Sequence, residues 1–152
     1  MMIIEVNEKN IFDAAKIHSV SWQESHRSFC ENEFVELHNP EHQLEYLLEK
    51  FKSGYKIFML LDTEPVGIVS VKENLIEDLY VLPNMQNKGY GTELLEFACA
   101  KCVGVPTLWI LENNVNAARL YRRKGFAETG RRQAITENLD EIEFAKEVVE
   151  IS

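Results

Sequence analysis

The sequence predicts a mixed α/β domain in which one sheet carries helices on both faces. Segments with strand and helix periodicity follow one another in the order β, α, α, α, β, β, β, α, β, α, β, β. Residues 75–82, 90–103 and 105–111 fit a β-α-β crossover, which is right-handed and makes its two strands parallel. Residues 131–148 fit two antiparallel strands around the turn "ENLD". This order of elements predicts a mixed sheet.

The first half of the chain supplies one strand and three helices. A short strand is expected at 2–7 and a helix at 10–26, with Asn10 as its cap and helical periodicity in Ile11, Ala14, Ala15, Ile17 and His18. A weaker helix is expected at 29–39. A third helix, at 40–54, begins at Pro40 and ends at Gly54, and its apolar stripe consists of Leu44, Leu47, Leu48 and Phe51.

The second half begins with strands. Residues 55–61 and 65–72 form a hairpin around "DTE", and a third strand at 74–82 stops at Pro83. The helix that follows places Leu94, Leu95, Ala98, Cys99 and Cys102 along one side. After the strand at 105–111, a helix at 113–126 ends at Gly125, where glycine suits a left-handed C-cap.

Length and composition limit the classes of protein. The 152 residues suit one domain, 1–152, without repeats or linkers. A formal net charge of −9 repels phosphates, so nucleic acid binding is not expected, whereas a cationic amine or peptide is compatible with it. No apolar run is long enough to span a membrane, and the N-terminus lacks the features of a secretory signal.

The chain has three cysteines, Cys30, Cys99 and Cys102. This small and odd number argues against a disulfide framework. It favours a reducing compartment, and a cytoplasmic protein is expected. The pair "CAKC" lies in a helical pattern, which favours small packed residues over a redox or metal site. His18, His38 and His42 share no spacing suited to a metal, so no metal site is expected.

The stretch "LYVLPNMQNKGYGTELLEF", residues 79–97, contains the strongest functional signal. A strand that turns directly into a helix presents unpaired N–H groups and a positive dipole end, which suit a phosphate. Gly89 and Gly91 allow close approach of an anion, and Gln86, Asn87 and Lys88 add donors. The spacing fits neither the Rossmann fingerprint nor the Walker A motif. From these residues alone, a tight turn without a ligand stays open.

Two motifs together resemble the Gcn5-related N-acetyltransferase (GNAT) family. Residues 79–91 are similar to its Q/R-x-x-G-x-G/A motif after a strand L-x-V-x-P, with Gln86, Gly89 and Gly91 in register. Residues 114–126 are similar to its N-x-x-A-x-x-x-Y-x-x-x-G-F element, including Asn114, Ala117 and Tyr121. The resemblance covers nearly the whole chain. It implies a mostly antiparallel central sheet in which two parallel strands, 75–82 and 105–111, splay apart.

The resemblance also implies an activity and a set of binding residues. Such enzymes transfer the acetyl group of acetyl-CoA to an amine. The residues expected to bind acetyl-CoA are Leu79, Tyr80, Val81, Gln86, Asn87, Lys88, Gly89, Tyr90, Gly91, Thr92, Asn114, Ala117 and Tyr121. A backbone N–H near Tyr80 or Val81 would stabilise the oxyanion. Tyr121 would protonate the departing sulfur, since an ordinary phenol is protonated at neutral pH.

The base and the acceptor are less sharply indicated. Glu77 is the first choice for the base, directly or through water, with Asp78 or a chain of waters as alternatives. Simple alternation puts Asp78 on the face opposite Glu77, and a bulge, frequent here in the family, would change that order. Trp22 and His26 are four residues apart on one helix face and could line the amine pocket.

Several alternatives stay open at this point. The acceptor could be a small-molecule amine or a peptide. Dimers are frequent in the family, so a homodimer is compatible with the sequence. A non-catalytic acyl-CoA-binding module and a transferase of a longer acyl group are the competing functions. Packing of Trp22 in the core competes with its role in the amine pocket.

Overall fold

The computed structural model describes residues 1–28 and 30–148. In these residues one seven-stranded sheet has the strand order β1-β2-β3-β4-β5-β7-β6. Its strands are β1 (Met2–Glu5), β2 (Lys56–Asp62), β3 (Glu64–Lys72), β4 (Leu75–Val81), β5 (Thr107–Leu111), β6 (Phe126–Thr136) and β7 (Leu139–Lys146). The helices are α1 (Ile11–His26), α2 (Asn32–Glu36), α3 (Pro40–Lys52), α4 (Tyr90–Lys101), α5 (Val115–Arg123) and a 3-10 turn, η1 (Pro83–Met85).

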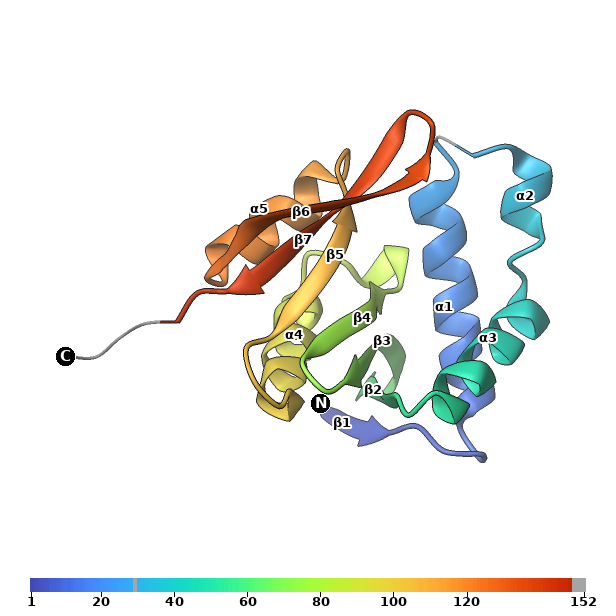
Figure 1. Cartoon of the computed structure of the whole chain (residues 1–152). Helices are drawn as coiled ribbons and strands as arrows, with labels where there is room; N and C mark the ends of the chain where they lie inside the picture. Colours follow the sequence, from blue (N-terminus) through green and yellow to red (C-terminus); the bar gives the residue numbers. More distant parts are fainter. Residues whose placement is uncertain (29, 149–152) are drawn as a thin grey trace.

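The helices cover both faces of the sheet, as the sequence predicts (Figure 1). One buried cluster joins α1 and α3 to the sheet through residues such as Ala14, Leu47 and Ile68. A second cluster joins α4 and α5 to the other face and includes Leu94 and Phe144. Among the described residues, no helix is long and apolar enough to cross a membrane.

The two parallel strands separate soon after they begin. β4 pairs with β5 only at Leu75–Thr107 and Ile76–Leu108, whereas the other strand pairs are antiparallel. Beyond these pairs, the side of β4 that faces β5 has no strand partner. The predicted splay is therefore confirmed.

The helix boundaries follow local chemistry. The side chain of Asn39 accepts a hydrogen bond from the His42 N–H at 2.9 Å, and Pro40 occupies the first turn of α3. Gly54 and Gly125, with φ of 92° and 88°, are left-handed after α3 and α5, as predicted. Asn10 stands at the N-cap of α1, but its side chain accepts from the Asn7 N–H and makes no capping bond.

Some boundaries and burial predictions were wrong. α2 is shorter than predicted (residue 29 lies outside the described residues), Cys102 follows α4, and β6 begins five residues before 131, at Phe126. Leu48 is 41% exposed, although Leu47 is fully buried. The buried face of α3 also contains Gln43 and Lys50. These two polar side chains bind groups on α1 and β4. The helix is therefore rotated so that its buried face contains them and Leu48 is left at the surface.

Gly67 permits close packing between β3, β4 and α4. A Cβ at this position would lie 2.7 Å from Leu94 Cδ1 and 2.9 Å from the Tyr80 carbonyl oxygen. We therefore expect Gly67→Ala to lower the free energy of unfolding by about 2 kcal/mol, measured by urea denaturation. Gly91→Ala is the control, because its Cβ would make only ordinary contacts, at 3.9 and 4.0 Å. An unchanged midpoint for Gly67→Ala would contradict this explanation.

Candidate active site

The glycine turn places the start of α4 beside the open edge of β4. Asn87 and Gly89 have φ of 64° and 88°, and Gly89 is the N-cap of α4. The Gly89 carbonyl accepts the first bond of the helix, from Glu93 N–H at 3.1 Å. In the described residues no acceptor faces the N–H groups of residues 89–92. These amides, together with the helix dipole, can bind an anion.

Gly91 fits a binding turn better than a purely structural one. Its φ is not in the left-handed region, and a Cβ would meet Leu120 and Val81 side chains at ordinary distances of 3.9 and 4.0 Å. Neither backbone geometry nor packing therefore requires a glycine here. A glycine within a helix costs about 1 kcal/mol relative to alanine. The missing side chain leaves room for a group outside the chain, such as a phosphate.

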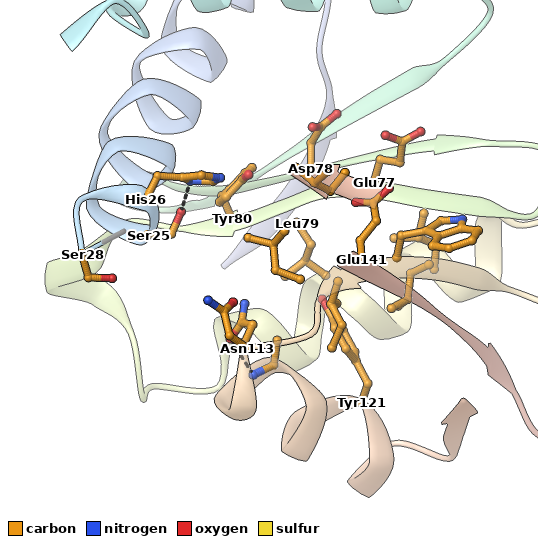
Figure 2. A pocket seen from close by; sticks show the side chains of 18 residues that line it. Ser25, His26, Ser28, Glu77, Asp78, Leu79, Tyr80, Asn113, Tyr121 and Glu141 are labelled. Atoms are coloured by element: carbon orange, nitrogen blue, oxygen red, sulfur yellow. Dashed lines mark hydrogen bonds between the residues drawn. The ribbon is translucent and has the colours of Figure 1, made fainter. Parts of the chain in front are cut away.

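A cavity of about 570 Å³ lies where β4 and β5 diverge (Figure 2). Residues from β4, β5, α5, the end of α1 and the β6–β7 hairpin line it: Ser25, His26, Ser28, Ile76, Glu77, Asp78, Leu79, Tyr80, Leu108, Trp109, Ile110, Leu111, Asn113, Asn114, Ala117, Tyr121, Ile135 and Glu141. The structure thus brings Glu77, His26, Asn114 and Tyr121, which are far apart in the sequence, to one hollow.

Residues 76–80 of β4 line the cavity, and beyond Ile76 the edge of β4 toward β5 has backbone groups without a strand partner. Leu82 N–H donates to the Val66 carbonyl at 2.9 Å, and the register pairs Tyr80 with Ile68. Because hydrogen-bonded pairs alternate along antiparallel strands, Tyr80 also bonds toward β3, whereas Val81 faces away from it. The Val81 carbonyl accepts from Gln86 Nε2 at 3.2 Å, which fits this direction. Val81 is therefore the better-placed backbone donor of the two that the sequence suggested.

A bulge at Asp78 decides which side chains of β4 share a face. The register shifts between Ile68 and Ser70, and Asp78 has a left-handed φ of 53°. Both Glu77 and Asp78 consequently reach the ammonium of Lys50 on α3. Leu79 instead packs with the cluster under α4 and α5. Simple alternation, which separates Glu77 from Asp78, was wrong here, and the bulge is the reason.

Tyr121 is on the α5 side of the cavity and is buried, with 8% of its surface exposed. Its ring contacts the rings of Phe126 and Phe144, whose centroids are 5.9 and 6.4 Å away. Burial raises the pKa of Tyr121 to about 12. The phenol therefore stays protonated at neutral pH and can donate a proton or a hydrogen bond.

Asn114 and Ala117 define the start of α5 beside Tyr121. The Asn114 side chain accepts from the Ala117 N–H at 3.1 Å and so caps the helix. Both residues also line the cavity. Tyr90 is different: its hydroxyl donates to Asp62, away from the cavity lining, so only its backbone belongs to the turn.

Lys50 holds the carboxylates of Glu77 and Asp78 together. Its Nζ lies 2.9 Å from Glu77 Oε2 and 3.3 Å from Asp78 Oδ2. The Tyr55 hydroxyl donates to Glu77 Oε1 at 2.6 Å, and the Tyr46 hydroxyl donates to Asp78 Oδ1 at 2.9 Å. Both carboxylates therefore have a nearby cation and a hydrogen-bond donor.

His18 of α1 lies between Asp78 of β4 and Gln43 of α3 and contacts both side chains. Its Nε2 lies 3.4 Å from Asp78 Oδ1, and its Nδ1 lies 2.5 Å from the Gln43 amide nitrogen. Burial alone would raise the pKa of Asp78, but His18, Lys50 and Tyr46 outweigh it and lower the pKa to about 2. Asp78 is therefore a stable anion and a weak base.

The two residues predicted for the amine pocket are placed differently. His26 lines the cavity. Trp22 is outside the cavity lining and stacks between His26 and His38, with centroids 3.9 and 3.5 Å away. Trp22 thus supports the position of His26 and joins α1 to the segment after α2.

Several residues of this region had no signal in the sequence. Glu141 of β7 lines the cavity. The sequence of β7 contains three acidic residues, and its pattern does not indicate which of them reaches the cavity. The sequence places Lys50 and His18 on helices, but it does not indicate that they contact the carboxylates of β4. Cys30, Cys99 and Cys102 are free, and the last two pack against the core, as predicted. The described residues contain no group of three or more His, Cys, Asp or Glu arranged to hold a metal.

Comparison with known proteins decides the family. A model of the Acetyltransferase (GNAT) family matches residues 15–126, which include both the glycine turn and Tyr121. The chain belongs to the GNAT family. The glycine turn and the splayed strands described above lie within the matched residues.

Relatives of known sequence or structure agree with this GNAT fold. The chain is 29% identical over 91 residues to the peptidyl-lysine N-acetyltransferase YjaB of Salmonella typhimurium, a match over 59% of this chain and 62% of YjaB. A Thermoplasma acidophilum PaiA N-acetyltransferase in complex with coenzyme A has a TM-score of 0.69, 18% identity and coverage of 97% and 100% of the two chains. YncA from Salmonella typhimurium, solved with its cofactor acetyl-CoA, has a TM-score of 0.66 and 18% sequence identity. This match covers 100% of the present chain and 96% of YncA.

Proposed function

We propose that this GNAT protein transfers the acetyl group of acetyl-CoA to a primary amine of a small molecule or peptide, within a ternary complex. One observation carries the proposal: β4 lines a cavity that reaches Tyr121 and continues through the glycine turn into the unpaired amides at the start of α4. The fold-related PaiA and YncA structures, with bound coenzyme A and acetyl-CoA, support the choice of donor.

The donor would bind along the edge of β4 and the turn into α4. The amides of the turn, together with Gln86, Asn87, Lys88, Gly89, Tyr90, Gly91 and Thr92, would bind the diphosphate. Val81, with Leu79 beside it, would hold the pantetheine arm through backbone groups that lack a strand partner. Asn114 and Ala117 would form the wall on the α5 side, where both residues line the cavity.

Acetyl-CoA supplies the activated acetyl thioester. The N–H of Val81, which points away from β3, would stabilise negative charge on the carbonyl oxygen. Tyr121 would donate its proton to the departing sulfur, because its raised pKa keeps the phenol neutral. Glu77, the first choice for the base from the sequence, is disfavoured in this role because Lys50 and Tyr55 already bind its carboxylate.

The acceptor class is proposed from the chemistry of the cavity and one relative. YjaB is named a peptidyl-lysine N-acetyltransferase, so a peptide lysine is the first acceptor to test. His26 would lie beside the amine, with Trp22 stacked behind it. The homodimer and the cytoplasmic location remain predictions from the sequence.

The direct test is acetyl-CoA consumption against a panel of lysine peptides, peptide N-termini, polyamines and small amines. We expect Tyr121→Phe to lower kcat about 100-fold and to leave the Kd for acetyl-CoA unchanged, because the ring fills the same space without its proton. A steady-state assay of acetyl-CoA consumption measures kcat, and titration calorimetry measures the Kd for acetyl-CoA. An equal kcat would remove Tyr121 from the mechanism. Binding of acetyl-CoA without turnover of any amine would favour the non-catalytic module.

A further inference from the structure

We propose that Glu141 is the carboxylate that contacts the acceptor's ammonium group and takes up its proton. This assignment rests on the proposed acetyl transfer and adds a residue of β7 to it. It also implies that the acceptor is cationic when it binds.

The cavity has two sides, and Glu141 lies on the side opposite Tyr121. Ile142 and Phe144 pack in the cluster that contains Tyr121, under α4 and α5. Because side chains alternate along a strand, Glu141 faces the other side of the sheet. Tyr80 also packs on that side, with the cluster of α1 and α3. An amine entering beside α1 would therefore meet Glu141 before it reached the group bound near Tyr121.

Three carboxylates line the cavity, but their partners differ. Glu77 and Asp78 both contact Lys50, and each also accepts a hydrogen bond from a tyrosine hydroxyl. Within the described part of the chain, the Glu141 carboxylate accepts a hydrogen bond only from the side-chain amide of Gln133, which is neutral. Among the described residues, no Lys, Arg or His nitrogen forms an ion pair with Glu141. Its negative charge is thus available to a cation from outside the chain.

The surroundings of Glu141 favour a carboxylate that can exchange a proton. Burial, followed by the charge of Glu77, raises its pKa above the ordinary value. The groups that line the cavity with it are Glu77, Asp78 and Tyr80 of β4, His26 of α1 and Tyr121 of α5. Both arginines of β6 near Glu141 have other partners: Arg132 pairs with Glu112 and Asp140, and Arg131 pairs with Glu143. A base is more effective when its pKa lies closer to neutrality.

The proton balance of the reaction defines the role of Glu141. The bound R–NH3+ gives one proton to Glu141, and the freed lone pair then forms the N–C bond to the acetyl carbon. The C–S bond breaks as its electron pair returns to sulfur, which receives the proton of Tyr121. The nitrogen loses a second proton, which restores Tyr121 directly or through solvent, and Glu141 releases its proton to solvent. The products are R–NH–CO–CH3, CoA–SH and one net proton.

The test compares Glu141→Gln with Glu77→Gln across pH 6.5–10, using Nα-acetyl-lysine amide as acceptor. We expect Glu141→Gln to lower kcat/KM about 100-fold at pH 7, with the deficit shrinking toward pH 10 as the amine loses its proton unaided. The Kd for acetyl-CoA should not change. Glu137→Gln, in the exposed turn of the same hairpin, is the matched control. A deficit that is absent, constant with pH, or found in Glu77→Gln instead overturns the proposal.

A binding measurement decides the case in which wild-type protein acetylates no probe. Carboxyl carbon signals of the CoA-saturated protein are followed by NMR while Nα-acetyl-lysine amide is added. The Glu141 signal should move, and Nα-acetyl-norleucine amide, which lacks the ammonium, should leave it in place. Movement confined to Glu77 or Asp78 overturns the assignment. Failure of acetyl-CoA to bind at all would count against the proposed function rather than against Glu141.

Discussion

Replacing Gly91 with valine should abolish measurable binding of coenzyme A while the protein stays folded. The amides of residues 89–92 have no acceptor in the described chain, so we expect them to bind the diphosphate. The two methyl groups of valine would stand in that space. We expect at least a 100-fold rise in Kd, which corresponds to about 2.7 kcal/mol, measured by titration calorimetry.

The stability of the variant separates loss of binding from loss of fold. A Cβ at Gly91 would lie 3.9 Å from Leu120 Cδ2 and 4.0 Å from Val81 Cγ2, which are ordinary contacts. Valine is also a better helix former than glycine. The circular dichroism spectrum and the melting temperature should therefore match the wild type, and Gly91→Ala should bind with intermediate affinity. A valine variant with unchanged Kd would rule out the proposed phosphate site.

The fold could be predicted because its signals are local. Pro40 and Gly54 bound α3, Gly125 ends α5, and apolar, β-branched runs mark the central strands. The glycine turn could be predicted for the same reason, since strand, glycines and helix follow one another directly. Leu48 shows the limit: apolar spacing placed it in the core, but the partners of Gln43 and Lys50 set the rotation of α3.

The acceptor side of the cavity could not be predicted, because its residues meet only in three dimensions. Lys50 reaches β4 from α3, and His18 reaches it from α1. The bulge at Asp78 changes which side chains share a face, and a strand pattern contains no signal for its position. Glu141 is one of several acidic residues on β7, and only the path of that strand brings it to the cavity.

Replacing Lys50 with methionine should destabilise the protein by about 3–5 kcal/mol at pH 7. Methionine fills a similar volume, so the change mainly removes the positive charge. Asp78, whose side chain is 8% exposed, would then remain buried without its cation, and the half-buried Glu77 would lose the same partner. Removal of one partner from a buried ion pair typically has this large cost. Urea denaturation followed by fluorescence measures the free energy of unfolding.

The pH dependence distinguishes this electrostatic cause from lost packing. The folded-state pKa of Asp78 is about 2, below its ordinary 3.8, so its ionised form contributes about 2 kcal/mol above pH 4. That contribution disappears as the pH falls from about 4 to about 2. Without Lys50 the pKa of Asp78 should rise, and the difference between variant and wild type should be smaller at pH 3 than at pH 7. Lys52→Met, at an exposed surface pair with Glu49, should change stability by less than about 1 kcal/mol. A loss that is equal at both pH values would show that Lys50 acts through packing of its chain against Tyr46 and Tyr55.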